Sequence, residues 1–321
     1  MKRASTIFGL IGILLVGCAG KNNMEAKIVS RIDLVGIPSA SGIEFLHGHY
    51  YVIGDNSPSL YLLDSSFHLE KSIPVSTKDV LEDGVVPKAT KKDLEAMCGY
   101  SDGNDSVILI LGSGSKSPVR DHAKLIRFQG DVPILEEYDL FSFYMHVKER
   151  SKLSDDAFNI EAAAVLDDRL YLFNRGENKI IDCSLPKFME HLKGEIDADE
   201  VKIKVTKIDL PLIKGIEAGF SGACTDSQND RILFTASVEN TANWIDDGQV
   251  LGSFIGVLDP DKLSDHITPT AIEIKEDGNI LPIKVESIAI YESNEGSVKC
   301  VLVTDSDGGV SELLNVTISF R

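Results

Sequence analysis

The sequence predicts an all-β protein with the fold of a five-bladed β-propeller, and three observations support this prediction. First, five segments of similar character recur at intervals of 54 to 66 residues. Second, a polar turn and another apolar, β-rich run follow each segment, which is the pattern of an antiparallel hairpin. Third, further β-rich runs complete most intervals, and four antiparallel strands per repeat are typical of propeller blades.

Each repeated segment begins with Glu or Ser, continues with a small residue and then becomes apolar. The five segments are Ser41–Ile43, Glu95–Met97, Glu161–Ala163, Ser221–Ala223 and Glu286–Ile288. The second strands are expected at Tyr50–Gly54, Val107–Gly112, Leu170–Asn174, Ile232–Ala236 and Val298–Thr304. Third strands are expected at Leu60–Leu63, Lys124–Phe128, Lys179–Cys183, Phe254–Leu258 and Leu313–Ile318, and fourth strands at Leu69–Val75, Ile134–Leu140, Val201–Leu210 and Thr270–Lys275.

The fifth repeat lacks a fourth strand, whereas a spare strand at Lys27–Leu34 precedes the first repeat. We therefore expect this N-terminal strand to close the ring as the outer strand of the last blade. A helical piece is expected at Phe141–Ser151, between the second and third blades. A six-bladed ring and a two-domain sandwich are the alternatives.

The first residues have the pattern of a bacterial lipoprotein leader. Lys2 and Arg3 precede an apolar run that is too short to span a bilayer, and the run ends in the lipobox-like sequence Leu15–Cys18. We expect residues 1–17 to be a signal peptide, 18–26 a lipidated Cys18 with its tether, and 27–321 a single propeller domain. The protein is then expected to be a monomer at the bacterial cell envelope, on the outer membrane or a periplasmic face, and its lipid the only membrane contact.

Charge and cysteine content narrow the classes of function. The formal net charge is -18, from 32 basic and 50 acidic residues, and no basic patch interrupts it. Such a field repels phosphate backbones, so a nucleic-acid polymer is excluded as a partner. The remaining cysteines, Cys98, Cys183, Cys224 and Cys300, each lie in an apolar strand-like run, and we expect four buried free thiols.

The starts of the five first strands line one end of the central channel in a propeller. Ser41, Glu95, Glu161, Ser221 and Glu286 are therefore expected to converge there. Carboxylates that meet in a narrow channel raise each other's pKa, and a hard cation removes the conflict. Ca²⁺ accepts carboxylate and hydroxyl oxygens with loose geometry, so these five residues are candidate Ca²⁺ ligands. The alternative is that they solvate a water-filled channel.

The ends of the second strands and the loops after them lie at the same end of the channel. Their polar residues are candidates for binding an anionic, metal-chelated substrate, because cations beside carboxylates suit phosphate oxygens. The candidates are Asp55, Asn56, Lys116, Arg120, His122, Asn174, Arg175, Glu239, Trp244, Asp305 and Asp307. Trp244, the single Trp, is a candidate for stacking on a base or sugar, with packing under its loop as the alternative.

The order Ser, Glu, Glu, Ser, Glu at the blade starts resembles that of the calcium-dependent apyrases. The stretches that carry the resemblance are Ser41–Leu63 with Gly48–Tyr51, Ile160–Ala163 running to Asn174–Arg175, Gly219–Gly222 followed by Asp230–Ile232, and Lys284–Ile288. Apyrases are five-bladed propellers that hydrolyse nucleoside di- and triphosphates, and the resemblance implies Ca²⁺ at the five blade-start positions. This chain departs from their pattern: Asp55-Asn56 stands in place of two acids, and Asn174-Arg175 in place of paired arginines.

Two classes of function follow from these expectations. In the first, the protein is a hydrolase in which Ca²⁺ chelates a phosphoanhydride, Asp55 or Asp305 orients water, and Arg175 stabilises developing charge. The residues expected to bind its substrate are Asn56, Lys116, Arg120, Trp244 and Asp307. In the second, the protein is a non-catalytic, calcium-stabilised surface propeller that binds a small molecule, glycan, peptide or partner lipoprotein. A glycosidase or esterase-like hydrolase is a third, weaker alternative.

Overall fold

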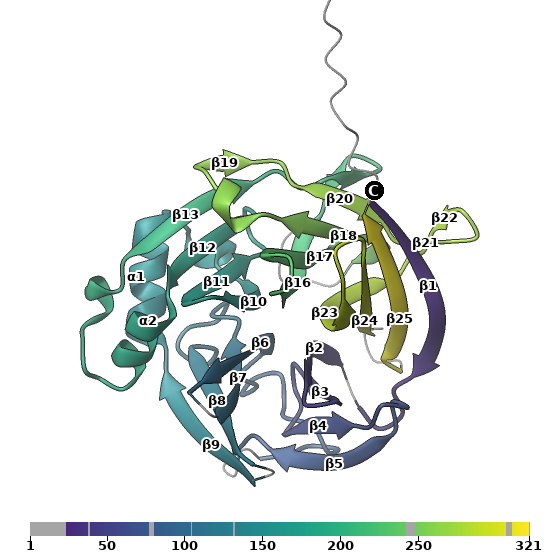
Figure 1. Ribbon diagram of the computed structural model, residues 1–321. Coiled ribbons are helices and arrows are strands. Elements are labelled where there is room, and N and C mark those ends of the chain that lie inside the picture. The colour runs from purple at the N-terminus through teal and green to yellow at the C-terminus, as the bar shows by residue number, and fades with distance from the viewer. Residues whose placement is uncertain are drawn as a thin grey trace, which may run out of the picture.

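The computed structural model describes residues 24–37, 39–76, 80–103, 105–130, 132–241, 248–305 and 310–320. Figure 1 shows five sheets arranged around a central axis, with one strand of each sheet next to that axis. The prediction of a five-bladed β-propeller is confirmed. No described helix is long and apolar enough to cross a membrane.

Blades one and two are simple four-stranded antiparallel meanders. Blade one consists of β2 (Ala40–Leu46), β3 (His49–Gly54), β4 (Ser59–Leu63) and β5 (Leu69–Pro74). Blade two consists of β6 (Leu94–Asp102), β7 (Asp105–Gly112), β8 (His122–Gln129) and β9 (Val132–Asp139). In both blades the strand order in space equals the order along the chain, because short turns join antiparallel neighbours.

The connection within blade four contributes a short strand to the outer edge of blade three. Blade three consists of β10 (Ile160–Leu166), β11 (Arg169–Asn174), β12 (Lys179–Ser184) and β13 (Ile203–Ile208), and blade four of β16 (Gly219–Asp226), β17 (Arg231–Asn240), β18 (Gln249–Leu258) and β20 (Thr270–Glu273). A two-residue strand, β19 (His266–Ile267), leaves blade four and pairs in parallel with β13, so it covers the outer edge of blade three. This strand is not among those predicted from the sequence.

Blade five is closed by the N-terminal strand, as predicted. β1 (Met24–Asp33) pairs antiparallel with β25 (Glu312–Phe320), and β24 (Ser297–Asp305) and β23 (Lys284–Ser293) complete the sheet. Figure 1 shows the purple β1 beside the yellow β25 at the rim of the ring. Two small hairpins lie outside the blades: β14 (Leu212–Ile213) with β15 (Ile216–Glu217), and β21 (Lys275–Glu276) with β22 (Asn279–Ile280).

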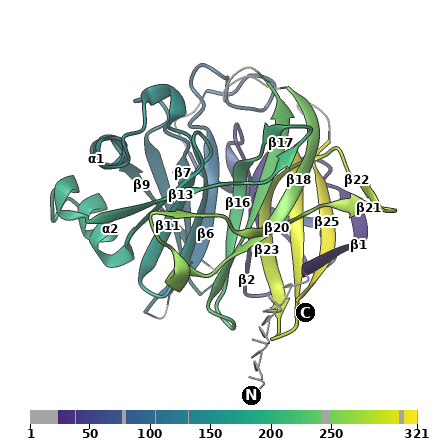
Figure 2. The ribbon, with the colours of Figure 1, turned by 90° about the horizontal axis from the view of Figure 1, so that it is seen from above.

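Two helices pack on the outside of the ring beside blades two and three. The predicted α1 spans Phe141–Ser151, and α2 (Leu185–Leu192) is inserted between β12 and β13, where no helix was predicted. Ser184 is the N-cap of α2 and Pro186 follows in its first turn, which is a sequence signal for a helix start. Figure 2 shows both helices on the same flank of the molecule, and Phe143 of α1 stacks edge to face on Phe188 of α2. Short 3-10 turns span Asp155–Ala157, Ala198–Glu200 and Pro260–Lys262.

The hydrophobic core lies between blades rather than at the axis. Five clusters of buried side chains fill the five junctions between neighbouring blades, and the largest, between blades two and three, also includes the apolar faces of both helices. The four described cysteines are free and buried, as predicted: Cys98 and Cys183 belong to the junction of blades two and three, and Cys224 and Cys300 to that of blades four and five. Because the apolar contacts lie between blades, the channel itself is left to polar side chains.

Deleting residues 24–33 should remove β1 and expose the edge of β25 along its whole length. Met24, Ala26 and Ile28 pack in the apolar cluster of blades four and five, so the ring would lose both hydrogen bonds and buried surface. Against a total stability of about 5–15 kcal/mol, we expect aggregation or loss of a cooperative melt. Thermal melts of this truncation and of a control chain that begins at Met24 check the result, and equal melting temperatures would contradict it.

Candidate functional site

A β-bulge lies near the start of the innermost strand of every blade. Each bulge contains the residue that begins a repeated segment of the sequence. The register shifts lie between Ala40 and Gly42, Leu94 and Ala96, Ile160 and Ala162, Phe220 and Gly222, and Val285 and Ser287. The extra residue in each case is Ser41, Glu95, Glu161, Ser221 or Glu286. A bulge residue has no cross-strand partner, and its side chain can be aimed away from the pleat. The five residues therefore occupy equivalent positions at the same mouth of the channel.

The two serines of this set are hydrogen-bonded within the protein. Ser41 Oγ donates to the carbonyl oxygen of Leu94 over 2.7 Å, which joins blade one to blade two. Ser221 Oγ donates to Thr235 Oγ1 over 3.1 Å, and both residues are buried. The serines thus hold the inner strands in place, and their role as Ca²⁺ ligands stays a prediction.

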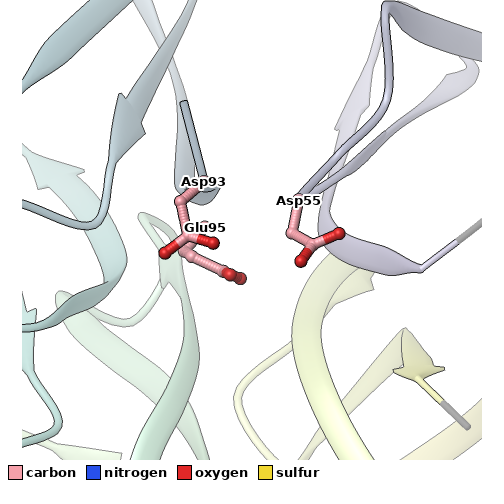
Figure 3. Close-up of side chains that lie close together, drawn as sticks. All are labelled: Asp55, Asp93 and Glu95. Carbon is pink, nitrogen blue, oxygen red and sulfur yellow. The ribbon is translucent and has the colours of Figure 1, made fainter. Parts of the chain in front are cut away.

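Three carboxylates from two blades meet at this mouth. Asp55 follows β3 directly, Asp93 precedes β6, and Glu95 is the bulge residue of β6; each offers one oxygen within 4.8 Å of the others. Figure 3 shows the side chain of Asp55 on one side and those of Asp93 and Glu95 facing it on the other. Within the described residues, no other three Asp, Glu, His or Cys side chains come this close together. Glu161 and Glu286 lie outside this group.

Two cations neutralise part of the charge of these three carboxylates. Lys91 Nζ forms ion pairs with Asp55 and, over 2.7 Å, with Asp93 Oδ1, so the ammonium lies between the two acids. Arg120 pairs with Asp93 Oδ2, which also accepts a hydrogen bond from Ser113 Oγ over 2.6 Å. Asp93 therefore has several donors, whereas Asp55 Oδ1 is buried and has no hydrogen-bond partner.

The opposite side of the mouth carries a second charged network. Arg175 is buried against Gly219 and pairs with Glu239 over 2.6 Å, and Lys284 pairs with Glu286 over 2.9 Å and with Glu239 over 3.6 Å. A Cβ at position 219 would stand 2.7 Å from Arg175 Cγ, so the glycine makes room for the arginine. Glu286 Oε2 is buried and has no hydrogen-bond partner. These pairs link blades three, four and five by charge rather than by apolar contact.

Burial perturbs the titration of several acids at the mouth. Desolvation, with Asp93 and Glu161 adding repulsion, raises the pKa of Glu95 well above its usual range. Desolvation also raises the pKa of Asp55, against the opposing charge of Lys91. It raises the pKa of Glu161 to about 7, although Arg175 opposes the shift. The mouth therefore holds more buried carboxyl groups than its own lysines and arginines stabilise in the ionised form.

The remaining predicted residues have different surroundings. Arg175 is enclosed by Glu239, Ser237 and the carbonyl of Phe220, and Asn174 bonds to the backbone of the neighbouring turns. Asn56 is partly buried, and its Oδ1 has no hydrogen-bond partner. Lys116 is exposed in the loop between β7 and β8, and Asp305 ends β24 opposite Lys284. Cys18, Trp244 and Asp307 lie outside the described residues.

Lys91, Asp93 and Lys284 are not among the candidate site residues predicted from the sequence. Asp93 and Lys284 both stand two positions before a bulge residue, where the other blades have Ser39, Asn159 and Gly219. Reading the repeat two residues further toward the N-terminus would have identified these two as channel residues. Lys91 lies in the connection between blades, outside the repeat, so no comparable signal marks it.

These features define a five-bladed β-propeller with a densely charged channel mouth. The chain matches, over residues 36–318, a family described as a family of unknown function (DUF6929), and it belongs to that family. Comparison with curated proteins gave no match.

Several solved structures are similar to this chain at low identity. Glutaminyl cyclase from Myxococcus xanthus has a TM-score of 0.48 at 11% identity, covering 92% of this chain and 97% of its own. An exo-1,5-α-L-arabinanase from a bovine ruminal metagenomic library has a TM-score of 0.48 at 10% identity, and the match covers 89% of this chain and 93% of the arabinanase. Virginiamycin B lyase from Staphylococcus aureus has a TM-score of 0.41 at 10% identity, and the match covers 93% of this chain and 100% of the lyase.

The raised pKa of Glu161 gives a prediction with a defined sign. The folded state holds this proton more tightly than the unfolded chain, so in the presence of chelator stability should fall as the pH rises from about 4.5 to 7. Glu161→Gln removes the buried charge, and we expect it to gain about 1–3 kcal/mol relative to wild type at pH 8, with no gain at pH 5. Denaturant unfolding at the two pH values measures the difference.

Glu239→Gln is the matched control for this variant. Glu239 is paired with Arg175, so its neutralisation leaves a buried guanidinium without its closest counter-charge. We expect Glu239→Gln to lose about 3–5 kcal/mol at pH 8, the opposite sign from Glu161→Gln. Loss of stability in both variants would show that Glu161 is ionised and well compensated in the folded protein.

Proposed function

We propose that the channel mouth binds a divalent cation, Ca²⁺ in the first instance, through Asp55, Asp93 and Glu95. The observation that carries the proposal is the approach of three carboxylate oxygens to within 4.8 Å of one another in a mostly buried position. Ca²⁺ takes six to eight oxygen ligands at about 2.3–2.6 Å, and clustered carboxylates that are taken out of water need such a counter-charge.

Two unpartnered oxygens support the same conclusion. Asp55 Oδ1 and Glu286 Oε2 are both buried without a hydrogen bond, and buried carboxylate oxygens are costly to leave in that condition. The charge of Glu286 adds to the raised pKa of Asp55, behind the larger effect of burial, so the two carboxylates interact across the junction of blades five and one. A cation near them would satisfy oxygens that the protein's own donors do not reach.

Lys91 is the competitor of this cation. Burial acts to lower the pKa of Lys91, but the charges of Asp93 and Asp55 raise it overall, so the ammonium stays charged between the two acids. A cation that binds Asp55 and Asp93 must displace this ammonium or share the carboxylates with it. Competition with Lys91 therefore favours a moderate affinity of the site for the cation rather than permanent occupation.

A cation bound to the folded state should raise its thermal stability. Stabilisation follows RT ln(1 + [L]/Kd), or about 2.7 kcal/mol at a hundredfold excess over Kd. We expect chelator to lower the melting temperature of the wild-type protein and Ca²⁺ to restore it, whereas Glu95→Gln should lose most of this response. Differential scanning calorimetry with chelator, Ca²⁺ or Mg²⁺ measures the effect.

Two further variants make this experiment selective. Glu70→Gln, on the exposed face of β5, removes one acid far from the channel mouth and should respond like wild type. Lys91→Met removes the competing ammonium, so it should be less stable in chelator and show a larger gain with Ca²⁺. A wild-type melting temperature that is indifferent to chelator, or a weaker Ca²⁺ response in Lys91→Met, would overturn the proposal.

The second candidate function is hydrolysis of a phosphoanhydride chelated by the bound cation. The observation that favours it is the ion pair of Arg120 with Asp93, together with the exposed Lys116 in the same loop as Arg120. In this proposal the Ca²⁺ supplies Lewis acidity, Lys116 and Arg120 bind phosphate oxygens, and Asp55 or Asp305 orients water. Arg175 is enclosed by protein groups, so it acts at a distance through its charge.

Calcium-dependent phosphate release from ATP or ADP by the purified domain, residues 24–321, tests this candidate. We expect Lys116→Ala to reduce release about tenfold by weakening substrate binding, and Asp55→Asn to abolish it. If Ca²⁺ binds but no phosphate is released from either nucleotide, the propeller is a calcium-stabilised binding module of the cell envelope. In both proposals the lipidated Cys18 anchors the domain to a bacterial membrane.

A further inference from the structure

The opposite mouth of the channel contains a cavity that shares no residue with the carboxylate cluster described above. Its volume is about 710 Å³, and the C-terminal ends of all five innermost strands, β2, β6, β10, β16 and β23, line it. Figure 1 shows these five strands grouped around the axis. The cavity is of the size that takes a small organic ligand rather than a single ion.

Glu44 is an anchored carboxylate in the wall of this cavity. Its Oε2 accepts a hydrogen bond from the backbone N–H of Gly99 in the next blade over 2.7 Å, and its Oε1 accepts one from the N–H of Phe45 over 3.0 Å. A Cβ at position 99 would stand 3.0 Å from Glu44 Cγ and 3.1 Å from its Cδ. The glycine thus leaves the space that the carboxylate occupies, and the carboxylate is held in one place across two blades.

The lining has the chemistry of a site for a cation. Beside Glu44 it includes four more acids, Asp167, Asp168, Asp226 and Glu292, and no Lys, Arg or His is among its described residues. Asp226 is compensated by Arg231 and Glu292 by Lys299, from outside the cavity. No ion pair within 4.0 Å joins Glu44, Asp167 or Asp168 to any described basic residue.

Aromatic side chains supply the apolar part of the wall. Phe45, Tyr100 and Tyr291 line the cavity and are partly exposed. Phe45 and Tyr291 also pack in the junction of blades five and one, with their rings 6.2 Å apart edge to face, and Tyr100 packs in the junction of blades two and three. Aromatic faces attract organic cations, and they cover the alkyl part of such a ligand at the same time. A small inorganic ion would use neither the volume nor the rings.

We propose that this cavity binds a small organic cation of the alkylammonium class, whose ammonium group pairs with Glu44 while the exposed parts of Phe45, Tyr100 and Tyr291 contact its alkyl part. The site is independent of the Ca²⁺ proposed at the other mouth, because the two sets share no residue. An alkylamine donates N–H groups to the carboxylate, whereas a quaternary ammonium relies on charge and the aromatic rings alone.

The pH dependence of binding is a supporting readout. Burial raises the pKa of Glu44 to about 7, so its carboxylate is protonated below that value and amine binding should weaken as the pH falls from 8 to 6. The other titratable groups that line the cavity are Asp167, Asp168, Asp226, Glu292, Cys98, Cys224, Tyr100 and Tyr291. Burial raises the pKa of Cys98, Cys224 and Tyr100, so these three stay neutral between pH 6 and 8, and Glu44→Gln separates the titration of Glu44 from that of the rest.

Isothermal titration of the domain, residues 24–321, with butylamine, putrescine, spermidine and choline tests the proposal, with 1-butanol as the uncharged control. We expect at least one of the four cations to bind at millimolar concentration or tighter and butanol not to bind. Glu44→Gln should weaken that binding about tenfold and remove its dependence on pH between 6 and 8. Glu95→Gln, at the other mouth, should leave amine binding unchanged.

Gly99→Ala tests the position of the Glu44 carboxylate separately from its charge. The new methyl group must displace the Glu44 carboxylate by a few tenths of an ångström while the net charge stays the same, so we expect a weaker affinity than wild type but a retained pH dependence. No binding of any of the four cations to wild type would overturn the proposal. So would binding that is equal in Glu44→Gln and wild type, or Ca²⁺ binding that Glu44→Gln abolishes and Glu95→Gln does not.

Discussion

The β-bulge at the start of each innermost strand is the constraint on which the arrangement of this protein depends. A flat ladder would alternate side chains between the two faces of each blade, and both faces are packed against neighbouring blades. The bulge releases one residue per blade from that alternation and lets its side chain enter the channel. Apolar side chains can then fill the five junctions, while the released polar residues lie at the axis.

Charge compensation across blades is the second consequence of this geometry. The cations at the mouth come from loops and strand ends, and each reaches an acid on another blade or on the connection to it: Lys91 to Asp55, Arg175 to Glu239, and Lys284 to Glu239. Such pairs are poor sources of net stability because both partners are desolvated. They specify how neighbouring blades meet at the mouth, and they leave an excess of buried carboxylate that a bound cation would relieve.

The two mouths of the channel offer different chemistry for the same reason. At the mouth where the inner strands begin, bulges and second-strand ends bring acids and bases together in dense networks. Where the inner strands end, no bulge is shared by all blades, and turns and aromatic residues line a cavity with an excess of acids. A ligand at one end and an ion at the other are therefore compatible with a single rigid ring.

The sequence by itself determined the number of blades, the closure by the N-terminal strand and the five residues at the starts of the innermost strands, because strand and turn signals recur in each repeat. That a β-bulge holds each of these five residues is seen only in the structure. The sequence did not predict α2 or the exchange of β19 onto blade three, since a single capping signal and a two-residue strand are too weak to stand out. Only the tertiary structure decided which charges meet. The pairing of Lys91 with Asp55 and Asp93, the enclosure of Arg175 and the anchoring of Glu44 on Gly99 all join residues of different blades or of the connection between them, and such contacts depend on how blades dock rather than on any local pattern.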